Sequence, residues 1–295
     1  MGKKKVLFNR KFREHVGSVL YLAPSLLGVL LFFVIPFGVV IYYSFIDNPV
    51  SANVVWFENY SKLLDNNAFK IAAKNTGLFS LVAVPLAVVL SLLLAIMLES
   101  KIPFKSQLRS FFFSPLMVPI ASIVLIWQVL FHDNGVVNEL IGKFGAEGID
   151  WLKSPQAQIV IVILFLWKNL GYNMILFMAA LSNIPSDIIE VARLESASAI
   201  KIFTKIKIRY LSSTILFVTI MSLINSFKVF REIYLLTGKY PFDSIYMLQH
   251  FMNNTFLSLD YQKLSAAAIL MSLVMIVIIG ALFIVENHFG KDVEG

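Results

Sequence analysis

The feature that constrains this chain most is a series of long segments that carry almost no charge. Five of them contain no Asp, Glu, Lys or Arg: residues 16–46, 77–98, 110–131, 210–227 and 264–285. A sixth, residues 156–182, contains the single charge of Lys168. The apolar core of a bilayer is about 30 Å thick, and a helix needs about 20 apolar residues to cross it. The sequence therefore predicts six membrane spans.

These spans are predicted to be helices, because lipid offers no partner to an unpaired backbone amide. A barrel would instead alternate polar and apolar residues over segments of about 10 residues. Only 15% of the residues are charged, whereas a soluble domain has about a quarter. The predicted fold class is an all-α polytopic membrane protein with spans at about 16–46, 73–98, 110–131, 157–181, 210–236 and 264–286.

The chain is predicted to form one membrane domain over residues 16–286, between a basic tail at 1–15 and a short tail at 287–295. An even number of spans puts both tails on one side. That side carries 15 Lys and Arg residues in its loops and tails, and the opposite side carries 7. The positive-inside rule places the richer side in the cytoplasm. We therefore expect a multi-pass protein of the bacterial cytoplasmic (inner) membrane with both termini inside.

The net charge of +7 is then a topology signal and a lipid contact, so nucleic-acid binding is not expected. The absence of cysteine excludes disulfides, thiolate nucleophiles and Cys metal sites. The four histidines, His15, His132, His250 and His288, are far apart in the chain, so each is expected at the surface and no metal site is predicted. No set of residues suggests a catalytic centre.

The longest inner loop, residues 182–209, is predicted to be a rigid helical elbow. Ser182 or Asn183 can cap a first helix, Pro185 suits its first turn, and Asp187 favours the positive end of its dipole. A second short helix is expected over residues 198–209. These properties alone fit an elbow with no role beyond structure.

The elbow also resembles the EAA loop of binding-protein-dependent ABC importer permeases, especially the sugar branch that includes the maltose permease subunit. The family pattern is roughly Glu-Ala-Ala, Arg, then Gly-Ala-Ser, then Ile-x-Leu-Pro. The chain matches it at Glu190, Ala192, Arg193, Ala197, Ser198 and Ile206. It departs at Val191, at Ser196 in place of Gly, and at Arg209 in place of Pro.

The resemblance extends over about residues 15–290, through short segments at 56–60, 111–113, 118–119, 181–185, 226–230 and 235–238. It implies the ABC type I importer permease (MetI-like) fold. It also implies four kinds of partner: a second homologous permease, as a heterodimer, two ATPase subunits, an extracytoplasmic solute-binding protein and a sugar or oligosaccharide. The chain has no phosphate-binding loop. It is therefore expected to be a transport subunit without a cofactor, while the partner ATPase uses ATP and Mg.

By this resemblance the elbow docks on the ATPase and couples ATP hydrolysis to alternating access. Glu190 and Arg193 would make polar contacts, while Ile188, Ile189 and Ala192 would form the buried face. The full set of coupling residues implied by the resemblance is Ile188, Ile189, Glu190, Ala192, Arg193, Ser196, Ala197 and Ser198.

Polar side chains inside the fourth and fifth spans form the candidate sugar site. Such residues are costly at membrane depth and face a cavity or another helix. The candidates are Lys168, Asn169, Tyr172, Ser222, Asn225, Ser226, Lys228, Val229 and Arg231. Two alternatives remain open: the amides and hydroxyls can bond helix to helix, and Lys228, Arg231 and Glu232 can form an internal ion pair or reach the outer interface.

Arg231 stands where the family usually has an acidic residue, and with Lys168 and Lys228 it favours an anionic sugar as one hypothesis. An ABC permease for another solute, such as glycerol phosphate or a peptide, is the nearest alternative. An ion-driven secondary transporter would need buried acidic residues, and Glu232 is the one acidic residue well inside a span. A membrane enzyme would need clustered carboxylates or histidines, which the chain lacks.

Overall fold

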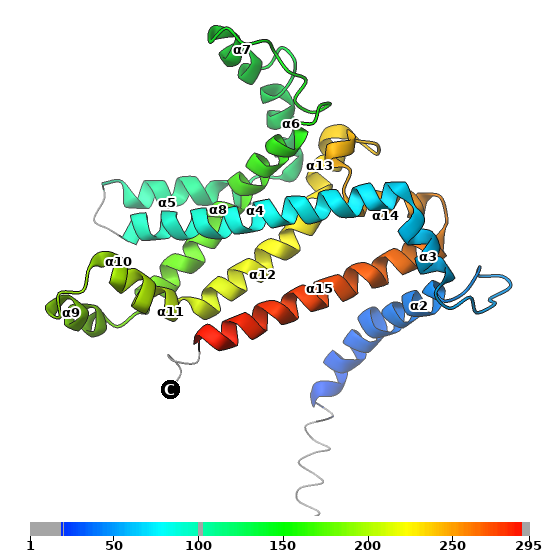
Figure 1. Ribbon diagram of the computed structural model, residues 1–295, viewed down its shortest axis with the longest axis horizontal. Helices are drawn as coiled ribbons and strands as arrows, with labels where there is room; N and C mark the ends of the chain where they lie inside the picture. The colour runs from blue at the N-terminus through cyan, green and yellow to red at the C-terminus, as the bar shows by residue number, and fades with distance from the viewer. Residues whose placement is uncertain (1–18, 20, 100–102, 291–295) are drawn as a thin grey trace, which may run out of the picture. The chain divides into compact units, whose positions relative to one another are not determined.

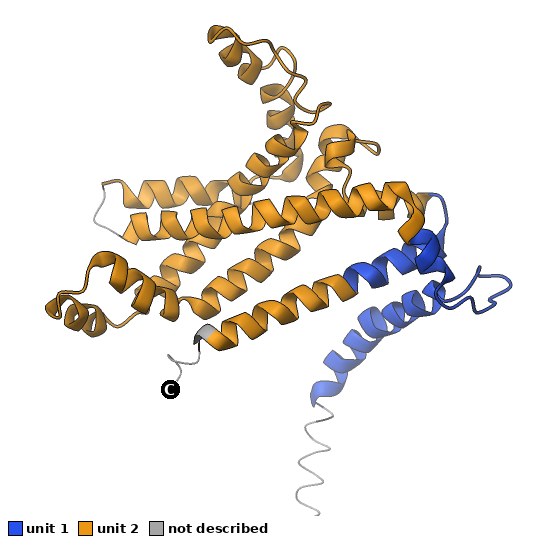
Figure 2. Ribbon diagram, in the orientation of Figure 1, with its two compact units in different colours: residues 1–63, 258–272 blue, residues 64–257, 273–295 orange. Residues whose placement is uncertain are grey.

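A computed structural model of the chain describes residues 19, 21–99 and 103–290. The predicted basic tail at 1–15, the start of the first predicted span, Lys101 and the last residues of the C-terminal tail lie outside the described residues. Within them the regular structure is helical, apart from one isolated bridge between Ile46 and Val54. The chain divides into two units, residues 1–63 with 258–272 and residues 64–257 with 273–295 (Figure 2).

The first unit contains the first span, a helix over Tyr21–Ser44. Within this helix, a π-helical turn η1 (Leu30–Val34) precedes α2 (Ile35–Ser44). The turn has a local cause in Pro36, which has no N–H and whose ring crowds the carbonyl four residues earlier. The backbone widens instead, and the N–H of Ile35 donates to the carbonyl of Leu30.

Hydrogen bonds order the segment after the first span. The amide of Asn59, in α3 (Glu58–Asp65), donates to the carbonyl oxygens of Ser44 at 3.0 Å and Ile46 at 2.8 Å. The hydroxyl of Ser51 donates to the carboxylate of Asp47 at 2.7 Å, and this bond is the main cause of a lowered pKa of Asp47. The segment between the first span and α3 is therefore folded by its own hydrogen bonds.

Three long helices form the body of the second unit: α4 (Asn67–Glu99), α8 (Ala157–Ser182) and α12 (Ser212–Lys228) (Figure 1). α4 packs against both α8 and α12, and α8 packs against α12. Small residues permit this close approach, since Ala83, Ala87 and Ala95 of α4 are all buried. Pro85 stays inside α4, which continues through it.

The third span is broken, which corrects the predicted continuous span at 110–131. α5 (Lys105–Phe113) and the 3-10 turn η2 (Ser114–Met117) run together, and α6 (Ile120–Leu130) then leaves at an angle of 102°. The break falls at Pro119, because a residue before proline avoids the helical region and Val118 is extended. Among the described residues, five helices are long and apolar enough to cross a membrane, and this bent pair would supply a sixth crossing.

The remaining helices follow along the chain. α7 (Val136–Lys143) follows the broken span, and α13 (Phe230–Thr237) continues the fifth span beyond Val229. η4 (Asp243–Ile245) and α14 (Leu248–Leu257) then lead to α15 (Tyr261–Gly290), the last span. A core of buried side chains joins α4, α6, α8 and α13, with Trp127 stacked on Phe131 at 5.0 Å between ring centres.

Candidate functional site

The predicted elbow is present as two helical pieces. α9 (Ser186–Leu194) comes first, and α10 (Ala199–Ile202), η3 (Phe203–Lys207) and α11 (Ile208–Tyr210) then follow without a gap. α9 begins after Pro185, and the Ser182 hydroxyl donates to the carbonyl of Met178 at 2.9 Å, so neither Ser182 nor Asn183 caps it as predicted. The second piece is capped by Ser198, whose hydroxyl accepts from the N–H of Lys201 at 3.3 Å.

The turn between the two pieces forms at Ser196, where the family pattern has glycine. Ser196 has φ of +60°, in the left-handed region that glycine adopts without strain. The turn is closed by the N–H of Ala197, which donates to the carbonyl of Ala192 at 3.0 Å. Serine thus makes the same helix-ending turn as glycine, at a conformational cost of about 1 kcal/mol.

The two faces of α9 differ sharply. Ile189, Ala192 and Ala197 are half-buried, and Ile189 packs against the core around Phe177 and Leu181. On the opposite face Val191 is 55% exposed and Leu194 is 85% exposed, with Ile188 beside them at 36%. One apolar face of α9 therefore packs against the rest of the chain. Among the described residues, nothing covers its second apolar face.

The elbow is also tied to α4. Lys207 of η3 makes an ion pair of 2.6 Å with Glu99, the last residue of α4. A cavity of about 620 Å³ lies between the elbow and α4, and its lining includes Leu93, Ile96, Ile189 and Phe203. Both residues of the ion pair border this cavity. Neither the ion pair nor the cavity could be anticipated from the sequence, since Glu99 and Lys207 are 108 residues apart.

Inside the membrane, the predicted polar residues of α8 and α12 pair largely with one another. The amide of Asn173 donates to the hydroxyl of Ser222 at 3.0 Å, and the amide of Asn225 donates to the side-chain oxygen of Asn169 at 2.9 Å. Asn169 in turn donates to the carbonyl of Phe165 at 2.8 Å. The structure brings these residues together as the sequence suggested, in a ladder of bonds between helices.

Ser226 and Val229 are also committed to packing. The hydroxyl of Ser226 lies 2.8 Å from that of Ser80 in α4, a residue the sequence analysis did not single out. Val229 is buried within the apolar core. Of the predicted sugar-site residues, Tyr172 and Asn225 remain half-exposed, and Lys228 and Arg231 are exposed.

The ion pair in this region is not the one considered from the sequence. Lys168 of α8, not Lys228 or Arg231, pairs with Glu232 of α13. Glu232 is only 5% exposed, and its second carboxylate oxygen has no hydrogen-bond partner among the described residues. The buried acid thus neutralises Lys168, and among the described residues no carboxylate is within ion-pair distance of Lys228 or Arg231.

A polar cap at one end of α4 and α8 holds these two helices and the η4–α14 segment together. The amide of Asn75 donates to the carbonyl of Tyr246 at 3.1 Å, and that of Gln158 donates to the carbonyl of Ser244 at 2.9 Å. His250 lies in this cap and is fully buried, so the prediction of a surface histidine there is wrong. Burial lowers the pKa of His250 to about 4, and its ring meets Phe230 edge-on at 4.6 Å.

Within the part of the chain that the structure describes, no group of His, Cys, Asp or Glu residues could hold a metal ion. The main features of the site are a polar seam between two spans and an elbow with an exposed apolar face.

The sequence is similar to those of known transport proteins. Residues 68–295 match the family model described as "Binding-protein-dependent transport system inner membrane component". The chain is 31% identical over 267 residues to the sulfoquinovosyl glycerol transport system permease protein SmoG of Agrobacterium fabrum, covering 88% of this chain and 86% of that protein. It is 27% identical over 288 residues to the trehalose/maltose transport system permease protein MalF of Thermococcus litoralis, covering 96% and 97% of the two chains.

The fold is also that of a solved transporter. A chain of a bacterial ABC transporter involved in the import of the acidic polysaccharide alginate matches with a TM-score of 0.81 at 19% identity, covering 96% of this chain and 98% of that one. A second structure of the alginate transporter, in complex with an alginate pentasaccharide-bound periplasmic protein, matches with a TM-score of 0.78, also at 19% identity, covering 95% of each chain. The permease fold and the family predicted from the elbow are confirmed: the chain belongs to the binding-protein-dependent transport system inner membrane components.

Proposed function

We propose that the chain is the permease subunit of an ATP-driven importer for a sugar or oligosaccharide, and that its elbow receives the motion of a separate ATPase. As a member of its family the chain is a membrane transport subunit and not an enzyme. The exposed apolar face of α9 carries the proposal, because apolar residues left uncovered on a helix outside the spans mark an interaction surface. The names of the relatives, which refer to sulfoquinovosyl glycerol, trehalose or maltose, and alginate, support a carbohydrate.

The proposed assembly contains a second homologous permease, two ATPase subunits that use ATP and Mg, and an extracytoplasmic solute-binding protein. The structure of the alginate transporter with a periplasmic protein supports the last of these. Both termini and the elbow would face the cytoplasm, as the distribution of Lys and Arg predicts.

The two faces of α9 suggest a refined division of the coupling residues. Val191 and Leu194, with Ile188, would enter the cleft of the ATPase, and Glu190 and Arg193 would make polar contacts at its edge. Ile189 and Ala192 would instead attach the elbow to its own chain, because they are already half-buried there. A rigid elbow attached on one face and gripped on the other can pass motion to α8 and α12.

The substrate is proposed to pass the exposed edge of the polar seam, where Tyr172 and Asn225 offer a ring and an amide. Lys228 at the end of α12 and Arg231 at the start of α13 are exposed further along the same span. Exposed cations inside a span are not expected to face lipid, because charge at membrane depth faces a cavity or another helix. We therefore assign them to the pathway, while Asn173, Ser222 and Ser226 would act through packing.

Within this function, an acidic saccharide is the preferred substrate class. Glu232 pairs with Lys168, whereas Lys228 and Arg231 are exposed and have no carboxylate within ion-pair distance among the described residues. A carboxylate, sulfonate or phosphate on the sugar would pair with them through charge-assisted hydrogen bonds. Two similar proteins are named for acidic compounds. The name of one relative refers to sulfoquinovosyl glycerol, and one solved structure is that of a transporter involved in the import of the acidic polysaccharide alginate.

Co-purification tests the coupling role. The chain is extracted gently from its native membranes, and bound proteins are identified for wild type, for Glu190→Lys in the elbow and for Glu139→Lys on α7 as the matched control. We expect an ATPase subunit with wild type and with the control, and its loss from Glu190→Lys. If no ATPase accompanies wild type, the importer function fails and an ion-driven carrier becomes the leading alternative.

Uptake by whole cells tests the substrate class. Cells are offered acidic oligosaccharides from pectin and alginate, or neutral ones from starch and xylan, with and without the chain. We expect chain-dependent uptake from the acidic pool, reduced about tenfold or more by Arg231→Asp. Uptake from the neutral pool alone would contradict the acidic assignment and leave the importer intact.

A further inference from the structure

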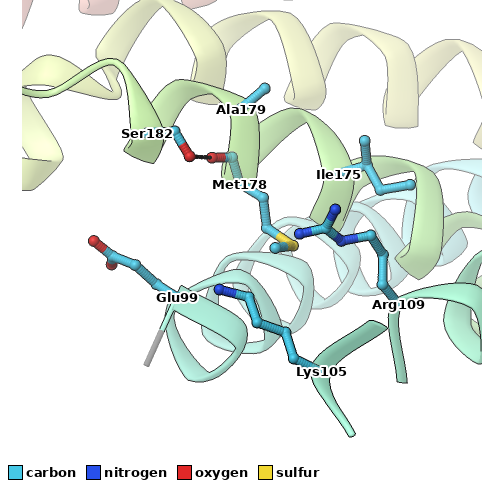
Figure 3. Close-up of a pocket in the computed structure, with 7 residues that line it drawn as sticks. All are labelled: Glu99, Lys105, Arg109, Ile175, Met178, Ala179 and Ser182. Atoms are coloured by element: carbon cyan, nitrogen blue, oxygen red, sulfur yellow. Dashed lines mark hydrogen bonds between the residues drawn. The ribbon is translucent and has the colours of Figure 1, made fainter. Parts of the chain in front are cut away.

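A second cavity lies where two spanning helices end. It has a volume of about 360 Å³ and is lined by Glu99 at the end of α4, by Lys105 and Arg109 of α5, and by the last turns of α8 (Figure 3). α4 ends at Glu99 and α8 ends at Ser182. Because both helices are long and apolar enough to cross a bilayer, we expect their common end at the depth of the lipid headgroups.

The cavity presents two positive charges to whatever fills it. Lys105 and Arg109 are four residues apart on α5 and so share one face of that helix, and both point toward the space beside Met178 (Figure 3). The acidic wall does not neutralise them, because the carboxylate of Glu99 is paired with Lys207 at 2.6 Å. In the described part of the chain no carboxylate lies within ion-pair distance of Lys105 or Arg109.

The opposite wall is apolar. Ile175, Met178 and Ala179 line it along one stretch of α8, and all three remain at least partly exposed. A small anion such as free phosphate would satisfy the two cations and leave this wall in water. A molecule with a phosphate joined to a hydrocarbon chain would satisfy both halves of the cavity.

We propose that this cavity binds the headgroup phosphate of an anionic phospholipid from the cytoplasmic leaflet, with the first carbons of an acyl chain along α8. The cytoplasmic side follows from the predicted orientation, and that leaflet is where anionic lipid attracts basic residues near the membrane surface. Basic pockets between spanning helices on this side are a known form of lipid recognition. The bound lipid would bridge α5 and α8 beside the elbow.

Native mass spectrometry of the full chain, purified in mild detergent, tests the proposal. The probes are phosphatidylglycerol and, as the uncharged comparison, phosphatidylcholine with the same acyl chains. Wild type is compared with Lys105→Gln/Arg109→Gln and with the charge-keeping swap Lys105→Arg/Arg109→Lys. We expect tighter retention of phosphatidylglycerol by wild type and by the swap, and a loss of about fivefold for each charge removed.

Two results would overturn the proposal. One is equal retention of phosphatidylglycerol by wild type and the Gln variant, with both proteins equally folded by their thermal unfolding in phosphatidylcholine. The other is displacement of the effect by inorganic phosphate at millimolar concentration, which would identify a soluble anion and not a lipid as the ligand. Neither result depends on the transported sugar.

Discussion

The polar seam between α8 and α12 differs from the elbow that joins these helices in which side chains are left without partners. In the seam, polar groups that would be costly in lipid are paired within the chain: Asn173 with Ser222, and Asn225 with Asn169. In the elbow, apolar groups that would be stable in a core stand exposed, most of all Leu194. The seam pairs most of its polar groups within the chain, whereas the elbow leaves an apolar face uncovered in the described residues, which we propose docks on the ATPase.

Polar residues inside a span and apolar residues in a loop therefore indicate different things. A polar residue inside a span draws attention as a possible substrate contact, yet most of those in the seam serve to fix the helices. An exposed apolar residue on a helix outside the spans is the more direct sign of an interaction surface. Substitutions should therefore affect stability in the seam and partner binding in the elbow.

The largest loss of stability is expected at Gly171 in the seam helix. A Cβ atom there would lie 1.9 Å from the carbonyl oxygen of Phe112, so α8 could not approach α5. We expect Gly171→Ala to cost more than about 3 kcal/mol, above the usual range for overpacking, because the obstacle is backbone. Thermal unfolding in mild detergent measures it, with Gly280→Ala, where the added atom meets nothing, as control. A stable Gly171→Ala protein would contradict the close approach of α8 and α5.

Removal of the cation from the buried ion pair is the next test. Lys168→Met leaves Glu232 buried without its partner, and breaking a fully buried pair costs about 3–5 kcal/mol. Because the Lys168 side chain is 33% exposed, water screens part of this, and we expect about 2 kcal/mol. The double variant Lys168→Met/Glu232→Leu should recover most of the loss in the same unfolding assay. Equal destabilisation in both variants would show that packing, not charge, is responsible.

Acid should weaken the buried cap around His250. Its folded-state pKa of about 4 is below the ordinary 6.5, so the unfolded chain binds the proton more readily. Stability is therefore complete above pH 6.5 and falls as the pH falls toward 4, by about 2 kcal/mol at pH 5. His250→Asn, which keeps an acceptor for the N–H of Met247, should remove this slope between pH 7.5 and 5. A slope unchanged in the variant would assign it to other groups.

A modest gain is expected in the elbow. Ser196→Gly relieves the positive φ at the turn and should stabilise the elbow by up to about 1 kcal/mol. Because the elbow can open without the seam, hydrogen exchange of residues 186–210 measures it better than global unfolding. Slower exchange is the expected outcome, and faster exchange would mean that flexibility of the free chain outweighs the relief of strain.

The smallest effect on stability is expected at the most exposed apolar residue. Leu194→Ser should change the unfolding temperature little, because the side chain is 85% exposed. It should nevertheless weaken co-purification of the ATPase, while Leu140→Ser, half-exposed on α7, should not. If Leu194→Ser leaves the ATPase bound, the proposed docking face is wrong.

The sequence allowed the helical spans, the elbow and the family to be predicted, because hydropathy, basic charge and a local motif are written in consecutive residues. What it could not supply depends on residues distant in sequence. The pairing of Lys168 with Glu232 joins two helices across 64 residues, and the contact of Gly171 with Phe112 is one of backbone geometry. Arg231 and Lys228 looked like partners for Glu232, since proximity along the chain was the only guide.

The bend at Pro119 was missed for a different reason. Hydropathy shows that residues 110–131 are apolar, but it does not show whether the helix axis changes direction within them. The direction is set at Pro119, because the residue before a proline avoids the helical region, and the extended backbone of Val118 turns the segment by 102°.

The ion pair between Glu99 and Lys207 gives the elbow a third point of attachment. A displacement of the elbow is then resisted not only by α8 and α12, which continue from its two ends, but also by α4. With three supports, a push on the elbow would tilt a group of helices together and would not swing a single hinge. A single weak surface contact between residues 108 apart would in this way decide whether the permease moves as a block or as separate rods.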